Sequence, residues 1–330
     1  MRVSFAEAMR RALAEEMRRD PRVWALGEDL STAHGNTSAT QYQGLIDEFG
    51  PRRIVNTPIS ESTIMGAAVG AALAGTRPVA ELRMADFGLC AIDELVNQAA
   101  KIRYMSGGQA RVPLVARQCI GTVRAAAAQH SLSNEAWFVH VPGLVVVTPA
   151  TPADGRGLFK AAVRCDDPVV FMEHKDLWAS EGEVDFESDG VVPLGHARVV
   201  RPGRDLTIVA WSRLALLAEK AAVELALVGI EAEVLDLRTL WPWDTAAVVA
   251  SARRTRRVLV VQETVLAGGF ANEVAAEIGE HLHGELIGPV RRLGAPRMPV
   301  PYAPTLEAAY RIEVPNIVAA ARRMFRAEAA

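Results

Sequence analysis

The stretch NTPISESTIMGAAVGAALAG, residues 56–75, runs from the end of a predicted strand into a helix of very small residues. Glu61 falls in the first turn of that helix, and Ser60 before it is a candidate N-cap. Each glycine inside a helix costs roughly 1 kcal/mol relative to alanine, so we expect close approach to another backbone as compensation. The pattern predicts a tight helix–helix or subunit interface with a carboxylate at its mouth.

The sequence on both sides of this stretch alternates between short β-branched runs and helical patterns. Apolar periodicity indicates helices over Ile92–Met105 and Leu214–Leu227. Near-continuous apolar strands separated by helices are typical of a mostly parallel sheet covered on both faces, which is the α/β class. The predicted strands are Val23–Leu26, Val79–Leu82, Leu114–Ala116, Val145–Thr148, Val169–Met172, Leu206–Ala210, Ala232–Leu237 and Val258–Gln262.

The N-terminal residues predict the first helix of the fold. Ser4 and Glu7 have the spacing of a capping box, and the apolar residues that follow line one helical face. Although the segment is rich in arginine, its acidic residues argue against a transit peptide.

The chain length predicts two domains. At 330 residues, half of them apolar, the chain exceeds a usual single core. An acidic, aperiodic stretch, Ser180–Gly190, separates two halves rich in strand–helix units. We therefore expect a first domain over residues 1–185 and a second over residues 191–330.

Composition excludes several classes of protein. The net charge of −3 and pI near 6.2 give no electrostatic reason to expect nucleic acid or an anionic membrane as partner. The three cysteines lack the spacing of a zinc site or a disulfide framework. No apolar run approaches the roughly 20 residues that span a bilayer. We expect a cytoplasmic protein.

Two polar side chains are candidates for acid–base chemistry. Glu61 either complements the helix dipole, which is worth about 0.3–1 kcal/mol, or serves in proton transfer. His130 lies in a polar loop between two strands, where a histidine suits acid–base work near neutral pH, although a surface histidine is equally compatible with that position. The sequence contains no G-x-G-x-x-G, no G-x-x-x-x-G-K-[ST] and no G-x-S-x-G motif, so dinucleotide, nucleoside triphosphate and serine-hydrolase chemistry have no support.

Taken together, these segments resemble the β subunit of thiamine-diphosphate-dependent 2-oxo acid dehydrogenases of the pyruvate, branched-chain and acetoin types. The resemblance runs nearly from end to end. The segments that carry it are Gly27-Glu28-Asp29, Thr57-Pro58-Ile59-Ser60-Glu61, Arg77-Pro78-Val79-Ala80-Glu81, Ala85-Asp86-Phe87, Tyr104-Met105-Ser106-Gly107-Gly108, His130-Ser131, Pro142-Gly143-Leu144, Asp236-Leu237-Arg238-Thr239-Leu240, Gly268-Gly269-Phe270 and Pro299-Val300-Pro301-Tyr302.

The resemblance implies a transketolase-like pyrimidine-binding domain with a mostly parallel sheet, followed by a three-layer αβα transketolase C-terminal domain. In this family the α subunit holds the cofactor's diphosphate and Mg²⁺ through a G-D-G…N motif. That motif is absent here, because Ala153-Asp154-Gly155 lacks the first glycine. An α₂β₂ heterotetramer is therefore implied.

The resemblance also assigns roles to particular residues. Glu61 matches the glutamate that hydrogen-bonds N1′ of the aminopyrimidine, and Ile59 matches a backbone contact to the same ring. Phe87 matches the aromatic residue that packs on the pyrimidine; filling the core is its alternative role. His130 matches a histidine near the thiazolium that is tied to acyl transfer onto a lipoyl group. Some members hold a structural K⁺ on backbone oxygens, which here correspond to Leu114, Ala162, Val163, Cys165 and Asp167.

Two residues depart from the family pattern. Arg83 stands where the family usually has Gln or Met near the pyrimidine, so it either acts on Glu61 or faces the partner subunit. Arg297 stands where members commonly have an Asp that pairs with a cation on the lipoyl acyltransferase. This reversal of charge predicts repulsion and puts the usual acyltransferase docking in question.

The leading hypothesis is thus a dehydrogenase subunit for oxidative decarboxylation of pyruvate or a branched-chain 2-oxo acid. The alternative is half of a split transketolase-like or stand-alone thiamine-diphosphate enzyme that does not use a lipoyl acyltransferase. The residues after Glu61 and His130 disfavour the alternative, because transketolases carry E-Q-N-type continuations.

Overall fold

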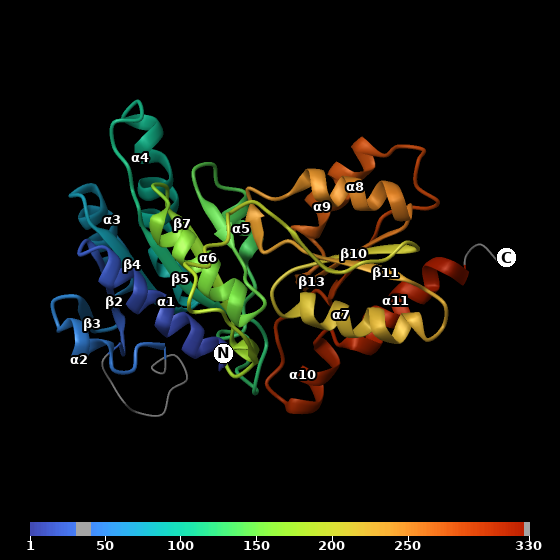
Figure 1. The fold of residues 1–330 in the computed structure, drawn as a ribbon, viewed down its shortest axis with the longest axis horizontal. Coiled ribbons are helices and arrows are strands. Elements are labelled where there is room, and N and C mark those ends of the chain that lie inside the picture. Colours follow the sequence, from blue (N-terminus) through green and yellow to red (C-terminus); the bar gives the residue numbers. More distant parts are fainter. Residues whose placement is uncertain (31–40, 327–330) are drawn as a thin grey trace. The chain divides into compact units, whose positions relative to one another are not determined.

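The structure is a computed structural model that describes residues 1–30 and 41–326, with the side chain of residue 326 left out. The chain divides into two compact units (Figure 1). The first unit comprises residues 1–121 and 129–194, and the second comprises residues 122–128 and 195–330. The short segment 122–128, which falls inside the first predicted domain, is therefore grouped with the second unit.

The first unit is built around a parallel sheet. Its elements in chain order are β1 (Arg2–Ser4), α1 (Phe5–Arg19), β2 (Val23–Glu28), α2 (Leu45–Phe49), β3 (Ile54–Thr57), α3 (Glu61–Leu73), β4 (Arg77–Met84), the 3₁₀ helix η2 (Phe87–Ala91), the π-helix η3 (Asp93–Ala99), α4 (Ala100–Met105), β5 (Val115–Ile120), α5 (Glu135–Val139), β6 (Val145–Val147), α6 (Pro152–Arg164), β7 (Val169–His174), the 3₁₀ helix η4 (Lys175–Leu177) and β8 (Glu181–Glu183).

The strands of the first unit follow the order β6-β7-β5-β4-β2-β3, and all these pairings are parallel. Every residue of β5 and of β7 is buried. Because successive side chains of a strand point to opposite faces, continuous burial means that both faces of the sheet are covered. The predicted α/β class and parallel sheet are confirmed.

The second unit repeats the α/β plan. Its elements are β9 (Arg198–Arg201), β10 (Leu206–Ala210), α7 (Arg213–Ala226), β11 (Ala232–Asp236), β12 (Thr239–Trp241), α8 (Thr245–Thr255), β13 (Val258–Val265), α9 (Ala271–His281), β14 (Arg291–Ala295), α10 (Pro304–Tyr310) and α11 (Val314–Arg326).

The sheet of the second unit has the order β14-β13-β10-β11-β9, in which β9 is antiparallel to its neighbour. Figure 1 shows α8 and α9 on one side of this sheet and α7 and α11 on the other. This arrangement is the three-layer αβα architecture that the sequence predicts for the C-terminal half.

Each predicted strand has a counterpart in the structure, and the strand predicted to end near Asn56 is β3, whereas β1, β8, β9, β12 and β14 were not predicted. Of these, β9 and β14 are the two edge strands of the sheet of the second unit, and both are rich in arginine. Charged residues are common on edge strands, because one side of such a strand faces solvent. In the second unit the hydrophobic pattern therefore detects the central strands and misses the two edges.

The predicted N-terminal helix is α1. Ser4 caps it by accepting a hydrogen bond from the Glu7 backbone N–H at 3.2 Å. The second half of the capping box does not form in this way, because the Glu7 carboxylate accepts hydrogen bonds from Arg10 and Arg11. The predicted apolar face is fully buried and packs on α6.

The acidic stretch Ser180–Gly190 is bound to the first unit rather than being a free linker. Its first residues form β8, which pairs with β1. Further along, Arg156 donates to the backbone oxygens of Asp185 and Ser188, and Arg164 contacts the Asp189 carboxylate at 2.6 Å. The hydrogen bonds from Arg164 and Lys160 hold the pKa of Asp189 well below its usual range.

Asp20 ends α1 and positions the start of β2. Its carboxylate accepts hydrogen bonds from the backbone N–H of Arg22 at 2.9 Å and from the Arg22 side chain at 2.8 Å. These bonds to Arg22 lower the pKa of Asp20 from 3.8 to about 2. Since the folded-state pKa is lowered, the stabilisation is complete above the ordinary pKa and is lost as the pH falls from 3.8 toward 2.

We expect Asp20→Asn to lower the free energy of unfolding by about 1 kcal/mol at pH 7, less than the pKa shift implies because Arg22 is largely exposed. Urea unfolding of both proteins at pH 7 and at pH 3 measures this effect. The difference between them should shrink by about half at the lower pH. An equal difference at both pH values would show that Asp20 acts through packing and not through its charge.

Candidate active site

The candidate residues of the first unit gather at one edge of its sheet. Glu28 of β2 pairs with Thr57 of β3, and Gly27 pairs with Glu81 of β4, so these parallel strands end side by side. The chain segments that leave their carboxyl ends carry Ile59, Glu61 and Phe87. In open α/β sheets, ligands bind outside the carboxyl ends of the strands.

Glu61 is the first residue of α3 and is half-buried. Ser60 does not cap the helix as predicted; its hydroxyl donates to the Pro58 carbonyl oxygen at 3.1 Å, and its backbone lies at φ −170° and ψ 65°. Ile59 is 72% exposed. The turn before α3 thus presents both a carboxylate and a backbone segment to a ligand or to another chain.

The glycine-rich face of α3 is open. The helix packs on β4, η2 and η3, and one turn before Gly70 a Cβ at Gly66 would lie 3.6 Å from Glu94. At Gly70 no described atom comes within 4 Å of the Cβ position, and the neighbouring Ala67 and Ala74 are exposed. Within the described part of the chain, the close approach predicted from the glycines is therefore not made at Gly70.

Phe87 and His130 meet although they come from distant parts of the sequence. Their ring centroids lie 5.1 Å apart in a T-shaped arrangement with an interplanar angle of 85°. The histidine loop is held from both sides: Asp86 accepts a hydrogen bond from the Leu132 backbone N–H at 3.2 Å, and Lys175 donates to the His130 carbonyl oxygen. His130 itself is exposed. The structure therefore places the imidazole of His130 directly against the ring of Phe87.

Several buried polar groups lie close in sequence or in space to the Phe87–His130 pair and were not predicted as site residues. Gln118 of β5 is fully buried, and its amide would lie 3.0 Å from a Cβ at Gly88, next to Phe87. Among the described residues, both amide atoms of Gln118 and the hydroxyls of Ser131 and Ser133 have no hydrogen-bond partner. Buried polar groups are normally satisfied, so these atoms fit a bound polar ligand or water. The polar loop around His130 was a sequence signal for Ser131 and Ser133, whereas no signal in the sequence pointed to Gln118.

Arg83, the first departure from the family pattern, is buried and forms an ion pair with Asp29 at 3.5 Å. Both residues occupy the left-handed region, with φ values of 58° and 57°. Non-glycine residues in this region carry strain that clusters at ligand sites. Because Arg83 is only 7% exposed, it is enclosed by its own chain and does not present a free surface to a partner.

A buried charge network lies in the sheet behind this edge. Arg117 of β5 pairs with Glu173 of β7 at 2.5 Å and with Glu81 of β4 at 3.6 Å, and all three residues are at most 1% exposed. Burial raises the pKa of Glu81 in spite of Arg117. Tyr42 donates to Glu81 at 3.1 Å, and Gln41 donates to Glu173 at 2.8 Å.

Some of the backbone oxygens predicted to hold K⁺ already accept hydrogen bonds within the chain. Arg77 donates to the carbonyl oxygens of Val163 and Cys165 at 3.0 and 2.9 Å. The Leu114 oxygen accepts from the Val169 backbone N–H at 2.8 Å. Separately, the described residues contain no cluster of His, Cys, Asp or Glu side chains that could hold a metal ion.

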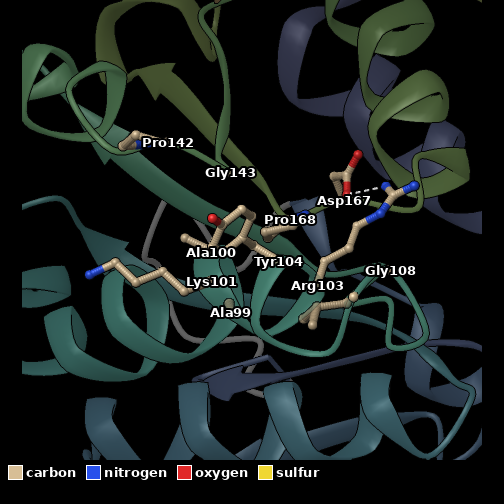
Figure 2. A pocket seen from close by; sticks show the side chains of 12 residues that line it. Ala99, Ala100, Lys101, Arg103, Tyr104, Gly108, Pro142, Gly143, Asp167 and Pro168 are labelled. Atoms are coloured by element: carbon tan, nitrogen blue, oxygen red, sulfur yellow. Dashed lines mark hydrogen bonds and ion pairs between the residues drawn. The ribbon is translucent and has the colours of Figure 1, made fainter.

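A groove of about 810 Å³ opens beside α4 (Figure 2). Arg103 donates a hydrogen bond to the Asp167 carboxylate at 2.5 Å. Figure 2 shows this pair together with Tyr104 and Pro168 in the lining of the groove. Tyr104 is 90% exposed and the adjacent Met105 is 66% exposed. Exposed large apolar residues beside an open groove mark an interaction surface.

Arg297, the second departure, lies in the segment that follows β14 and is exposed. Within the described part of the chain it makes no ion pair. No helix among the described residues is long and apolar enough to cross a membrane.

Two protein-family models match this chain, one for each of the two units. The family model "Transketolase, pyrimidine binding domain" matches residues 1–180, and "Transketolase, C-terminal domain" matches residues 195–317. The solved structure titled "Split gene transketolase, inactive beta4 tetramer" superimposes with a TM-score of 0.76 at 26% identity and covers 97% of each chain. The fold and the site thus define a protein of the transketolase type.

Relatives with higher identity narrow this class. The 2-oxoisovalerate dehydrogenase subunit beta of Bacillus subtilis is 42% identical over 98% of both chains. The pyruvate dehydrogenase E1 component subunit beta of Rhizobium meliloti is 41% identical over 96% of this chain and 67% of its own length. This chain belongs to the family of the β subunits of thiamine-diphosphate-dependent 2-oxo acid dehydrogenases.

We expect Asp86→Ala to loosen the histidine loop, because it removes the acceptor for the Leu132 backbone N–H. Hydrogen exchange at Leu132 should accelerate. If His130 acts in the reaction, turnover of the assembled enzyme should also fall by roughly tenfold through its misplacement. Asp86→Asn keeps an acceptor oxygen and serves as the matched control. Unchanged exchange in the alanine variant would mean that Asp86 does not position the loop.

Proposed function

We propose that this chain supplies the aminopyrimidine-activating half of a thiamine-diphosphate active site, with Glu61 as the activating carboxylate. The assembled enzyme would carry out oxidative decarboxylation of pyruvate or a branched-chain 2-oxo acid and transfer the acyl group to a lipoyl group. The observation that carries the proposal is the grouping of Ile59, Glu61 and Phe87 at the carboxyl edge of the first sheet, with His130 against Phe87.

The residues at this edge fit the aminopyrimidine. Glu61 is accessible at a helix start, so its carboxylate can share a proton at N1′, while the backbone at Ile59 contacts the same ring. Phe87 is half-buried and contacts His130 in a T-shaped geometry, so a pyrimidine can pack on the ring. When bound, thiamine diphosphate supplies a thiazolium ring that serves as an electron sink. His130 would move a proton during acyl transfer.

The proposed α subunit would supply the diphosphate and Mg²⁺ site for which this chain has no sequence motif. The sequence has neither a phosphate-binding glycine motif nor the G-D-G…N motif, so the diphosphate and Mg²⁺ would be held by the partner in an α₂β₂ heterotetramer. The open face of α3 around Gly70 and the exposed side chains of Ile59 and Tyr104 support such an interface. Small residues on that face permit close approach of a second backbone.

A lipoyl acyltransferase is proposed as the acyl acceptor, and Arg297 would set the strength of that contact. The alternative, a split transketolase-like enzyme without a lipoyl acceptor, is less well supported. The transketolase structure is 26% identical, whereas the dehydrogenase subunits are above 40% identical.

We further propose a weakly held K⁺ at the backbone oxygens of Leu114, Ala162, Val163, Cys165 and Asp167. A carbonyl oxygen has two acceptor positions, so oxygens that accept from Arg77 can still face a cation. The adjacent guanidinium charge opposes a second cation and would weaken its binding.

The division into domains over residues 1–185 and 191–330 and a cytoplasmic location complete the proposal. The contact units and the matched ranges of the two family models support the domain division. The composition of the chain supports the location.

The decisive experiment for Glu61 uses Glu61→Gln in the assembled αβ complex. We expect decarboxylation to fall by at least about 10²-fold, because the neutral amide cannot share a proton in the same way. Calorimetry should show that thiamine diphosphate still binds. Glu48→Gln, which alters an exposed glutamate of α2 that pairs with Arg18, is the control. A retained rate would make Glu61 only a helix-dipole partner, and turnover by the purified chain without an α subunit would refute the shared site.

A separate experiment addresses the acyl acceptor. If Arg297 repels a cation on the acyltransferase, Arg297→Asp should tighten binding to a peripheral-subunit-binding domain by about tenfold or more. Isothermal calorimetry on the αβ complex measures this affinity. Arg204→Asp makes the same charge change at another exposed site of the second unit. Equal affinities for the native complex and the Arg297→Asp complex would remove Arg297 from the docking contact.

A further inference from the structure

The second unit has two small hollows that are lined by arginine. One has a volume of about 180 Å³ and the other about 330 Å³. They share Arg291, Arg323 and Met324, so they adjoin. Arg257 lines the first hollow and Arg292 lines the second. We refer to these five residues together as the arginine groove.

The arginine groove carries positive charge without an acidic counterpart in its lining. No Asp or Glu lines either hollow, and within the described residues Arg291 and Arg323 make no ion pair. Arginines nearby in the sequence behave differently: Arg253 pairs with Glu285 at 3.1 Å, and Arg254 pairs with Glu233 at 2.5 Å. Converging like charges repel one another. An anionic ligand would relieve this repulsion.

Two of the guanidinium groups are held in place by the fold. Arg257 stacks over the ring of Phe325 at 4.6 Å, and Arg292 donates to the side-chain oxygen of Asn272. The other two, Arg291 and Arg323, are exposed and can close on a ligand. Guanidinium forks bind carboxylates in a bidentate geometry.

The groove also has features that a free inorganic anion would not use. Met324 provides an apolar surface in both hollows, and Leu293 does so in the larger one. β14 carries Arg291 and Arg292 and is the edge strand of its sheet. Edge strands offer unpaired backbone groups to an extended peptide, and pockets for its side chains then provide specificity.

We propose that the arginine groove binds an extended acidic segment of a partner protein. Carboxylates of that segment would pair with Arg291 and Arg323, its backbone would lie along β14, and an apolar side chain would rest on Met324. Charge complementarity and the edge strand select this occupant. The proposal does not rest on the proposed decarboxylation, because the arginine groove belongs to the second unit and Glu61, Phe87 and His130 belong to the first.

The test measures fluorescence anisotropy of a fluorescein-labelled peptide of alternating glutamate and valine with the full chain in its αβ complex. We expect saturable binding that weakens as salt is added. Arg291→Glu combined with Arg323→Glu should weaken binding by at least about tenfold. Arg204→Glu combined with Lys220→Glu makes the same change in net charge away from the groove and should leave binding within about twofold. Both double variants should keep the native melting temperature and turnover.

Four results would overturn the proposal. The first is absence of saturable binding by the native complex. The second is equal loss of affinity in the two double variants. The third is evidence that the groove does not recognise an acidic segment. Such evidence would be equally tight binding of a peptide with glutamine in place of glutamate, or full displacement by inorganic phosphate at low millimolar concentration. The fourth is a tenfold gain in affinity on deleting residues 327–330, because the occupant would then be the chain's own C-terminus.

Discussion

The ion pair between Arg117 and Glu173 is the interaction on which the first unit depends. Both side chains are almost fully excluded from solvent and lie 2.5 Å apart on the neighbouring strands β5 and β7. Losing one partner of a buried pair leaves an uncompensated charge, which costs about 3–5 kcal/mol. Glu81 extends the network to β4, and Tyr42 and Gln41 connect it to the segment that precedes α2. The network therefore favours one alignment of three adjacent strands.

That alignment determines where the candidate active site forms. Ile120 at the end of β5 is in register with His174 at the end of β7. The next residue, Gly121, has a φ of 97°, and a Cβ there would collide with the His174 ring. Its N–H donates to the Leu132 carbonyl oxygen at 3.2 Å, which ties the histidine loop to the sheet. The position of His130 against Phe87 thus follows from strand register.

The distribution of charge separates structural groups from groups that are available for chemistry. Glu81 is buried, and its raised pKa reflects the cost of keeping a carboxylate away from water. Glu61, at the carboxyl edge of the sheet, remains accessible at the start of a helix with an open face. In the second unit Arg253 and Arg254 have acidic partners, whereas Arg291 and Arg323 make no ion pair within the described residues. Glu61 in the first unit, and Arg291 and Arg323 in the second, are thus the charged groups that a partner protein or ligand can use.

The sequence by itself determined the α/β class, the central strands, the first helix and the family, because these depend on local periodicity and on ordered motifs. Glu61, Ile59, Phe87 and His130 were likewise identified from motifs, as proposals. Only the tertiary structure decided that Phe87 and His130 touch, that Arg83 pairs with Asp29, and that Ser60 does not cap α3. Edge strands such as β14 escaped prediction because their charged residues lack an apolar period. Contacts between residues far apart in sequence depend on strand order and register, and no local pattern encodes these. The arginine groove is such a case, since its residues come from three separate segments that meet only in the folded chain.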